Sequence, residues 1–188
     1  MTHSCPLLQT MSAAVLSLSL SAAAATPAPV PVILDTDLGD DIDDTWALAM
    51  LLRSPQLDLK LVTTTYGKAE YRARVIAKLL TVAGRSDVPV GLGAGGSEGS
   101  GKQQAWAEGF DLASYAGKVH RDGVQALIDT IMASPRPITL LSIGPSNTVA
   151  AALARQPAIA AKAVFVGMQG AVRKGYNGGA VCPEWNVK

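Results

Sequence analysis

Apolar residues fall into two kinds of pattern along this chain, and the two kinds alternate. Short apolar runs rich in β-branched residues are typical of buried strands, whereas longer segments with apolar residues three or four positions apart are typical of helices. The strands are predicted at Val30–Thr36, Leu57–Tyr66, Val88–Gly91, Pro137–Ile143 and Ala163–Gly167. The helices are predicted at Asp43–Arg53, Tyr71–Gly84, Gly123–Ala133 and Thr148–Arg155. This alternation predicts an α/β fold, with an open, mostly parallel sheet and helices on both faces.

The first 29 residues have a different pattern from the rest of the chain. Residues 13–25 are an uncharged run of Ala, Leu, Val and Ser, too short to span a bilayer as a helix. Ala23, Ala24 and Ala25 have the small-residue form of a signal-peptidase site. We therefore expect residues 1–29 to be a signal peptide and short linker, with a disordered Ala-rich extension as the alternative. The mature protein would be exported, to the periplasm or the medium, without a stable membrane anchor.

Composition narrows the class of protein for residues 30–188. The chain has 188 residues, of which 48% are hydrophobic and 16% are charged, and this balance is typical of one globular domain. The formal net charge of +1 and the lack of a basic stripe argue against a nucleic-acid partner. Cys5 would leave with the signal peptide, so Cys182 would have no partner for a disulfide and is expected to be a small buried residue.

An acidic segment follows directly on the first predicted strand. Six of the ten residues from Asp35 to Asp44 are aspartates, in a chain with only 15 acidic side chains. Carboxylates this close repel one another, and a buried set cannot all remain ionised without a cation. Ligands with oxygen atoms alone suit a hard ion, Ca²⁺ before Mg²⁺. The alternative is a solvated acidic loop that caps a helix.

The predicted sheet places these carboxylates where ligands bind in open parallel sheets, beyond the carboxyl ends of the strands. Asp35 and Asp37 are two positions apart, so their side chains leave the strand on the same side. Asp43 and Asp44 fall in the first turn of a helix, where the positive end of the helix dipole stabilises carboxylates.

The acidic segment also resembles a known family motif. Asp35-Thr-Asp-Leu-Gly39, followed by Asp43-Asp44 and Thr-Trp-Ala-Leu, is similar to the N-terminal motif of the inosine–uridine-preferring nucleoside hydrolases. Further segments resemble motifs of this family in the same order: Thr63–Gly67, Asp87–Gly93, Ile143–Thr148 and Glu184–Asn186. The resemblance implies a Rossmann-like nucleoside hydrolase fold over residues 30–188.

The resemblance also implies roles for individual residues. Asp37 matches the carboxylate that binds Ca²⁺ and takes a proton from the attacking water, and Asp44 matches a second calcium ligand. Ile143 stands where the backbone carbonyl completes the calcium coordination. The residues implied to bind the sugar hydroxyls are Asp43, Glu184 and Asn186.

The chain departs from the family pattern in three places. Two more residues separate Gly39 from the Asp-Asp pair than in the shortest family form, so Asp41 is a rival to Asp43, and Asp35 is a further candidate for the site. Lys68 stands where many members have an Asn that touches the ribose. Asn147 comes earlier than the family's Asn, and a helix cap is an equally good interpretation of it.

The activity implied by the resemblance is calcium-dependent hydrolysis of the N-ribosidic bond of a nucleoside, which releases ribose and the free base. The chain ends before the family's C-terminal region, which holds another calcium-ligating Asp and in some members a His that protonates the base. We therefore expect a domain truncated at its C-terminus. For the full-length protein, a homo-oligomer is possible, and the sequence does not determine which nucleobase is preferred. One alternative is an inactive nucleoside- or calcium-binding fragment. A more remote one is a phosphatase of the haloacid-dehalogenase type, which also has Asp-x-Asp after its first strand.

Overall fold

The computed structural model of the protein describes residues 27–171, 173–175, 178–182 and 184–187. In this part of the chain six strands form one sheet in the order β4-β3-β2-β1-β5-β6, and every neighbouring pair is parallel. The strands are β1 (Val30–Thr36), β2 (Leu57–Thr64), β3 (Val90–Gly91), β4 (Val119–His120), β5 (Ile138–Ser142) and β6 (Ala163–Gly167). The prediction of an open, parallel sheet is thus confirmed. Residues 1–26, which include the predicted signal-peptidase site, lie outside the described residues.

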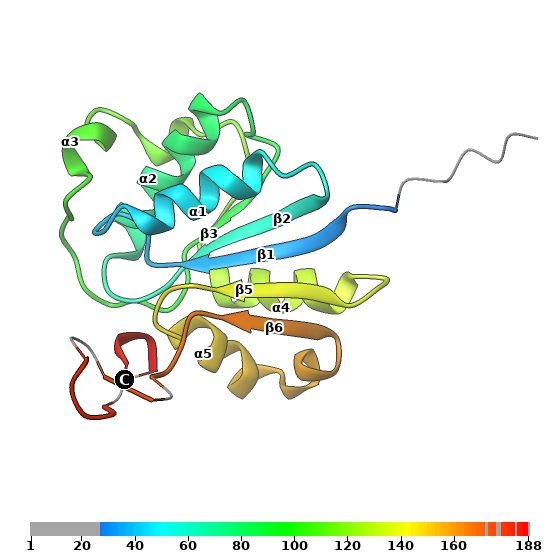
Figure 1. The fold of residues 1–188 in the computed structure, drawn as a ribbon. Coiled ribbons are helices and arrows are strands. Elements are labelled where there is room, and N and C mark those ends of the chain that lie inside the picture. Colours follow the sequence, from blue (N-terminus) through cyan, green and yellow to red (C-terminus); the bar gives the residue numbers. More distant parts are fainter. Residues whose placement is uncertain (1–26, 172, 176–177, 183, 188) are drawn as a thin grey trace, which may run out of the picture.

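Helices cover both faces of the sheet, as predicted (Figure 1). The α-helices are α1 (Asp43–Leu52), α2 (Ala69–Val82), α3 (Gln104–Ala107), α4 (Gly123–Ala133) and α5 (Asn147–Arg155). Short 3₁₀ helices are η1 (Leu112–Ser114), η2 (Pro157–Ala161) and η4 (Trp185–Val187). None of the helices in the described residues combines the length and apolar character needed to cross a bilayer.

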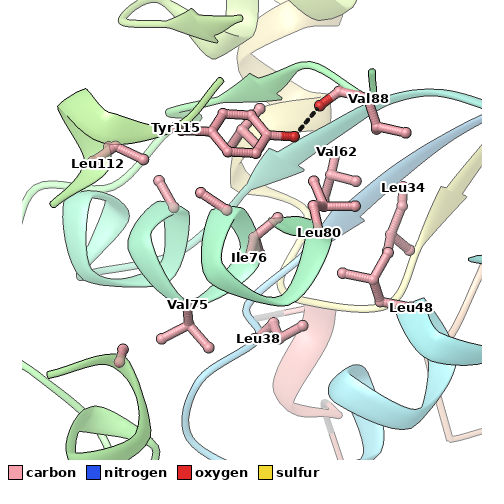
Figure 2. Packing of buried hydrophobic residues seen from close by; sticks show 14 of the residues in the cluster. Leu34, Leu38, Leu48, Val62, Val75, Ile76, Leu80, Val88, Leu112 and Tyr115 are labelled. Atoms are coloured by element: carbon pink, nitrogen blue, oxygen red, sulfur yellow. Dashed lines mark hydrogen bonds between the residues drawn. The ribbon is translucent and has the colours of Figure 1, made fainter. Parts of the chain in front are cut away.

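Neighbouring residues of the central strands contribute to two separate cores. Leu34 packs in a cluster with α1, α2 and α3, whereas Ile33 packs in a cluster with α4, α5 and η2. This division follows from the strand geometry, because successive side chains point to opposite faces of a sheet. Figure 2 shows the first cluster, in which Ile76 and Leu80 of α2 pack near Val62 of β2. Both faces of the sheet are therefore apolar, and the polar residues gather at its carboxyl end.

The central position of β1 creates the topological switch point of the sheet. From β1 the chain extends through β2 to β4 on one side and through β5 to β6 on the other. Asp35 near the end of β1 pairs with Ser142 at the end of β5. The loops after these two strands leave toward opposite faces, and they diverge at the position where ligands bind in doubly wound sheets.

The structure differs from the predicted elements in several details. β4 and α3 were not predicted, and β2 ends at Thr64 rather than Tyr66, because Tyr66 turns the chain with a φ of 56°. Asp122 caps α4, and its side chain accepts a hydrogen bond from the backbone N of Gln125. Asn147 is not a cap but the first residue of α5, after Ser146. Cys182 is exposed rather than buried.

Candidate functional site

A cavity of about 650 Å³ lies at the carboxyl ends of β1, β5 and β6. Its walls come from the acidic loop between β1 and α1, from Ile143 after β5, and from two segments after β6. The lining residues are Asp37, Asp40, Asp41, Asp43, Asp44, Ile143, Gly167, Met168, Gln169, Gly170, Glu184, Trp185 and Asn186. The structure thus brings together all but two of the residues that the sequence predicts for the site. The exceptions are Asp35, which lies buried in β1, and Lys68.

The acidic loop has a fixed shape because residues of α2 bind its backbone. The phenol of Tyr71 donates a hydrogen bond of 2.7 Å to the carbonyl of Gly39, and Arg72 donates to the carbonyls of Asp37 and Leu38. Gly39 has a φ of 126°, and a Cβ atom there would lie 2.7 Å from the Tyr71 ring. The glycine is required both by the backbone conformation and by the close approach of Tyr71.

Asp35 lies in the interior at the end of β1. Its Oδ1 accepts a hydrogen bond of 2.7 Å from the hydroxyl of Thr63, but Oδ2 has no hydrogen-bond partner. Burial, with a smaller contribution from the charges of Asp37 and Asp44, raises the pKa of Asp35 to about 8 against the effect of the Thr63 hydrogen bond. A buried carboxyl oxygen without a partner is unusual in proteins and suggests a missing positive charge or proton nearby.

Asp44 is the second buried carboxylate, in the first turn of α1. It is 7% exposed, and its Oδ1 accepts a hydrogen bond from the hydroxyl of Thr36. Burial raises the pKa of Asp44 to about 7 despite that hydrogen bond, and the charges of Asp37 and Asp43 add to the rise. Asp44 therefore brings a buried carboxylate from α1 to the lining of the cavity.

Asp37 is half-buried and lines the cavity together with Asp44. Burial raises its pKa, and the nearby Arg72 guanidinium opposes the rise. Gly144 packs directly against Asp37, because a Cβ atom on Gly144 would lie 2.7 Å from the backbone N of Asp37 and 2.8 Å from its Oδ1. The loop after β5 thus leaves no room for a side chain between Gly144 and the Asp37 carboxylate.

The two additional acidic residues of the loop are paired with basic side chains. Asp40 forms ion pairs with Arg72 at 2.9 Å and with Lys68 at 3.3 Å. Burial alone would raise the pKa of Asp40, but these two cations lower it below the usual value. Asp41 is 76% exposed and pairs with Lys102 at 2.9 Å. The charges of Asp40 and Asp41 are therefore balanced within the protein.

Two of the three predicted sugar-binding residues, Glu184 and Asn186, line the cavity on the side opposite the acidic loop. Nδ2 of Asn186 donates hydrogen bonds to the carbonyls of Ile143, at 3.0 Å, and Met168, at 2.8 Å. Its backbone N donates to the carboxylate of Glu184 at 3.0 Å. Both Nδ2 hydrogens are thus used within the protein, and Oδ1 is the amide atom that can accept a hydrogen bond from a ligand. Asp43 is exposed on the acidic wall.

The oxygen atoms around Asp37 fit a hard cation in chemical type. The charge of Asp37 raises the pKa of both Asp35 and Asp44, and a divalent cation would relieve this repulsion. The carbonyl of Ile143 adds a neutral oxygen at the same cavity. In the described part of the chain, however, no group of three His, Cys, Asp or Glu side chains is placed to hold a metal ion. A cation here would use carboxylates together with a backbone carbonyl and water.

The sequence analysis missed Arg72, which supports the acidic loop, and its pairing with Asp40. Arg72 is 1% exposed, on the face of α2 that also carries the buried Ile76 and Leu80. The spacing of four residues between these positions was the available signal, because an arginine on a buried helix face needs an acidic or carbonyl partner. The partner itself could not be read from the sequence, since Asp40 lies in a different element.

Comparison with known proteins agrees with this site. The sequence model of the inosine-uridine preferring nucleoside hydrolases matches residues 32–188. The non-specific ribonucleoside hydrolase RihC of Klebsiella pneumoniae subsp. pneumoniae is 35% identical over 135 residues, which are 66% of this chain and 43% of that protein. A plant nucleoside hydrolase, PpNRh1, is 30% identical with a TM-score of 0.65 over 84% of this chain and 53% of its own.

A third relative shows the shared fold. The structure of an inosine-guanosine nucleoside hydrolase has a TM-score of 0.68 at 22% identity, over 83% of this chain and 53% of that one. This chain therefore spans about half the length of the relatives that it matches. Because the family match covers the acidic loop, the Gly144 turn and the Glu184–Asn186 segment, the chain belongs to the inosine-uridine preferring nucleoside hydrolase family.

Proposed function

We propose that this chain carries the metal- and ribose-binding part of a ribonucleoside hydrolase, which cleaves the N-ribosidic bond of nucleosides to ribose and free base. The observation that carries the proposal is the single cavity shared by the acidic loop, Ile143 and the Glu184–Asn186 segment. Its oxygen-rich walls suit a sugar with several hydroxyls. Family membership also sets aside the phosphatase alternative.

Asp37 is proposed as the general base. It is half-buried, faces the cavity, and is held against Gly144, so it can take a proton from a water that attacks the anomeric carbon. The new bond joins the water oxygen to that carbon, and the bond to the base nitrogen breaks with its electrons leaving on the base. Ca²⁺ held by Asp37, Asp44 and the Ile143 carbonyl would polarise the water and bind the ribose diol.

The sugar hydroxyls are proposed to bind on both walls of the cavity. Asp43 and Glu184 can accept hydrogen bonds from them, and so can Oδ1 of Asn186. Lys68, by contrast, pairs with Asp40 and does not line this cavity. The ribose contact that many family members make at this position is therefore not proposed for Lys68.

A second candidate function is binding of a nucleoside or calcium without turnover. The departing base needs a proton, and the described lining of the cavity contains no His, Lys or Arg. His120 lies on β4, which is at the far edge of the sheet from β6.

The two candidates are separated by an assay of free ribose. The protein is produced in the longest form that its gene encodes and incubated with a panel of purine and pyrimidine nucleosides, with calcium or with a chelator. Calcium-dependent release of ribose supports the hydrolase. Binding of calcium and nucleoside without release supports the second candidate, and failure to bind either contradicts both.

We further propose that the protein is exported and that residues 1 to about 25 are removed. The support is the apolar run and the small residues Ala23, Ala24 and Ala25. N-terminal sequencing of the protein from the producing cell should find a start close to Thr26. Mature protein that still begins at Met1 or Met11 would contradict the proposal.

A further inference from the structure

Arg72 joins the loops that follow two neighbouring strands. Its Nη1 donates to the carbonyls of Asp37 and Leu38 after β1, and its Nε donates 3.0 Å to the carbonyl of Tyr66 after β2. Nη2 forms the ion pair with Asp40. The side chain is almost fully buried, so its planar group is fixed in position by four different acceptors.

Two of the three departures of this chain from the family pattern meet at Asp40. Asp40 is one of the residues between Gly39 and the Asp-Asp pair, where the loop is longer than in the shortest family form. Lys68 occupies the position of the usual Asn. In the structure Asp40 lies between Arg72 and Lys68 and pairs with both. The longer loop and the lysine are thus parts of one ion-pair network.

We propose that Arg72 is a positioning residue that, together with Asp40 and Lys68, holds the longer acidic loop so that Asp37 faces the cavity. Arg72 binds the carbonyl of Asp37 itself, and Asp40 anchors the next part of the loop to the same guanidinium. The role rests on the calcium site proposed above. It also gives Lys68 a role, because this side chain contacts the acidic loop and does not line the cavity.

Removal of Arg72 or Lys68 changes calcium affinity in opposite directions, depending on whether these residues act through their charge or by positioning the loop. Arg72 and Lys68 are cations close to the proposed calcium site, so their electrostatic effect weakens the binding of Ca²⁺. If they acted only through charge, their removal would strengthen calcium binding. If they position the loop, their removal weakens it, despite the lost repulsion.

The test measures binding of Ca²⁺ alone by calorimetry in the wild type and in the variants Arg72→Lys, Arg72→Met and Lys68→Met. We expect both Arg72 variants to weaken calcium binding by about 10- to 100-fold, the usual effect of losing a group that orients a metal ligand. Lysine should not substitute for arginine, since its single ammonium cannot bind the acceptors on both loops. Lys68→Met should weaken binding by less.

The control is Arg74→Met on the same helix. Arg74 is half-buried and has no hydrogen bond or ion pair with the described residues, so its loss should leave calcium binding unchanged or slightly stronger. Thermal unfolding with a chelator shows whether each variant is folded. If the Arg72 variants do not fold, the sign of the Lys68→Met effect decides, because this half-buried side chain can be replaced without opening the core.

The outcomes separate this role from the calcium site itself. A wild type that does not bind Ca²⁺ overturns the proposed site. If the wild type binds Ca²⁺, two results overturn the positioning role alone. One is a folded Arg72→Lys variant that binds Ca²⁺ as well as the wild type does. The other is a Lys68→Met variant that binds Ca²⁺ more tightly.

Discussion

Gly144 approaches Asp37 so closely that no side chain fits between them. A Cβ atom would lie within 3 Å of both the backbone and the carboxylate of Asp37, and of the Thr65 methyl group. We therefore expect Gly144→Ala to lower the free energy of unfolding by about 1–3 kcal/mol, the usual cost of overpacking, and to weaken calcium binding. Gly96→Ala is the matched control, since a Cβ atom there meets nothing within 4 Å. Denaturant titration and calorimetry measure the two effects, and an unchanged Gly144→Ala variant would contradict the described packing.

Asp37→Asn tests the proposed base directly. The substitution keeps the shape of the side chain but removes the negative charge and the basic oxygen. Loss of a positioned base lowers the rate by about 10²–10⁴-fold, and loss of a calcium ligand adds to this. The measurement is ribose release by the protein in its longest natural form. Near-normal turnover would rule out the assignment of Asp37.

At the scale of single residues, the sequence predicted what is local and missed what depends on distant contacts. The acidic segment and Glu184 and Asn186 were predicted because they are short motifs, and all of them line one cavity apart from the buried Asp35. The pairing of Asp40 with Arg72 could not be predicted, because a buried arginine has many possible partners until the fold is known. For the same reason the sequence did not show that Asn186 donates to the Ile143 carbonyl.

At the scale of elements, the long segments were predicted well. β1 and β6 match their predicted ranges, and the helices α1, α4 and α5 differ by at most one residue at an end. β4 and α3 were missed because two and four residues are too short to show a periodic pattern. β4 is a strand because it pairs with β3, and this pairing cannot be read from the two residues of β4.

The cap of α4 gives a prediction at this scale. The side chain of Asp122 accepts from the N of Gln125 and pairs with Arg155 at 2.8 Å. The Gln125 hydrogen bond, with help from Arg155, lowers the pKa of Asp122 below 3.8. Its contribution is therefore complete above about pH 4 and is lost as the pH falls through the lower pKa of the folded state.

The expected result is a loss of about 0.5–2 kcal/mol of unfolding free energy in Asp122→Ala at neutral pH. Asp122→Asn is the matched variant, because asparagine also caps a helix but does not titrate. It should retain most of the stability at neutral pH and lose less of it on acidification than the wild type does. Denaturant titrations between pH 7 and pH 3 would show this, and parallel curves for the two proteins would contradict it.

At the scale of the whole molecule, β6 forms one edge of the sheet that the described residues build (Figure 1). Val164, Phe165 and Val166 are each about half exposed, and an apolar groove of about 370 Å³ runs beside Phe165. An open edge strand with apolar side chains favours association with other chains. We expect residues 27–188 to bind a hydrophobic dye and to self-associate as the concentration rises.

Phe165→Lys should reduce both effects, because a charge on an edge strand opposes pairing. Val82→Lys is the control, since Val82 is 74% exposed at the end of α2 and distant in sequence from this edge. Sedimentation and dye fluorescence report the outcome. A wild type that remains monomeric and binds no dye would show that the edge is protected in another way.

The pairing of β1 with β5 also has a consequence for how the protein is made. Asp35 emerges from the ribosome about a hundred residues before its partner strand, and its own sheet neighbour β2 follows much sooner. A growing chain can therefore form the β1–β2 pair while the other wall of the cavity has not yet been synthesised. During that interval the carboxylates are open to water on the side that Gly144 later covers, so they can remain hydrated and charged until β5 docks. The cost of burying them then falls on the step in which β5 docks, and a cation bound at that step would offset part of this cost.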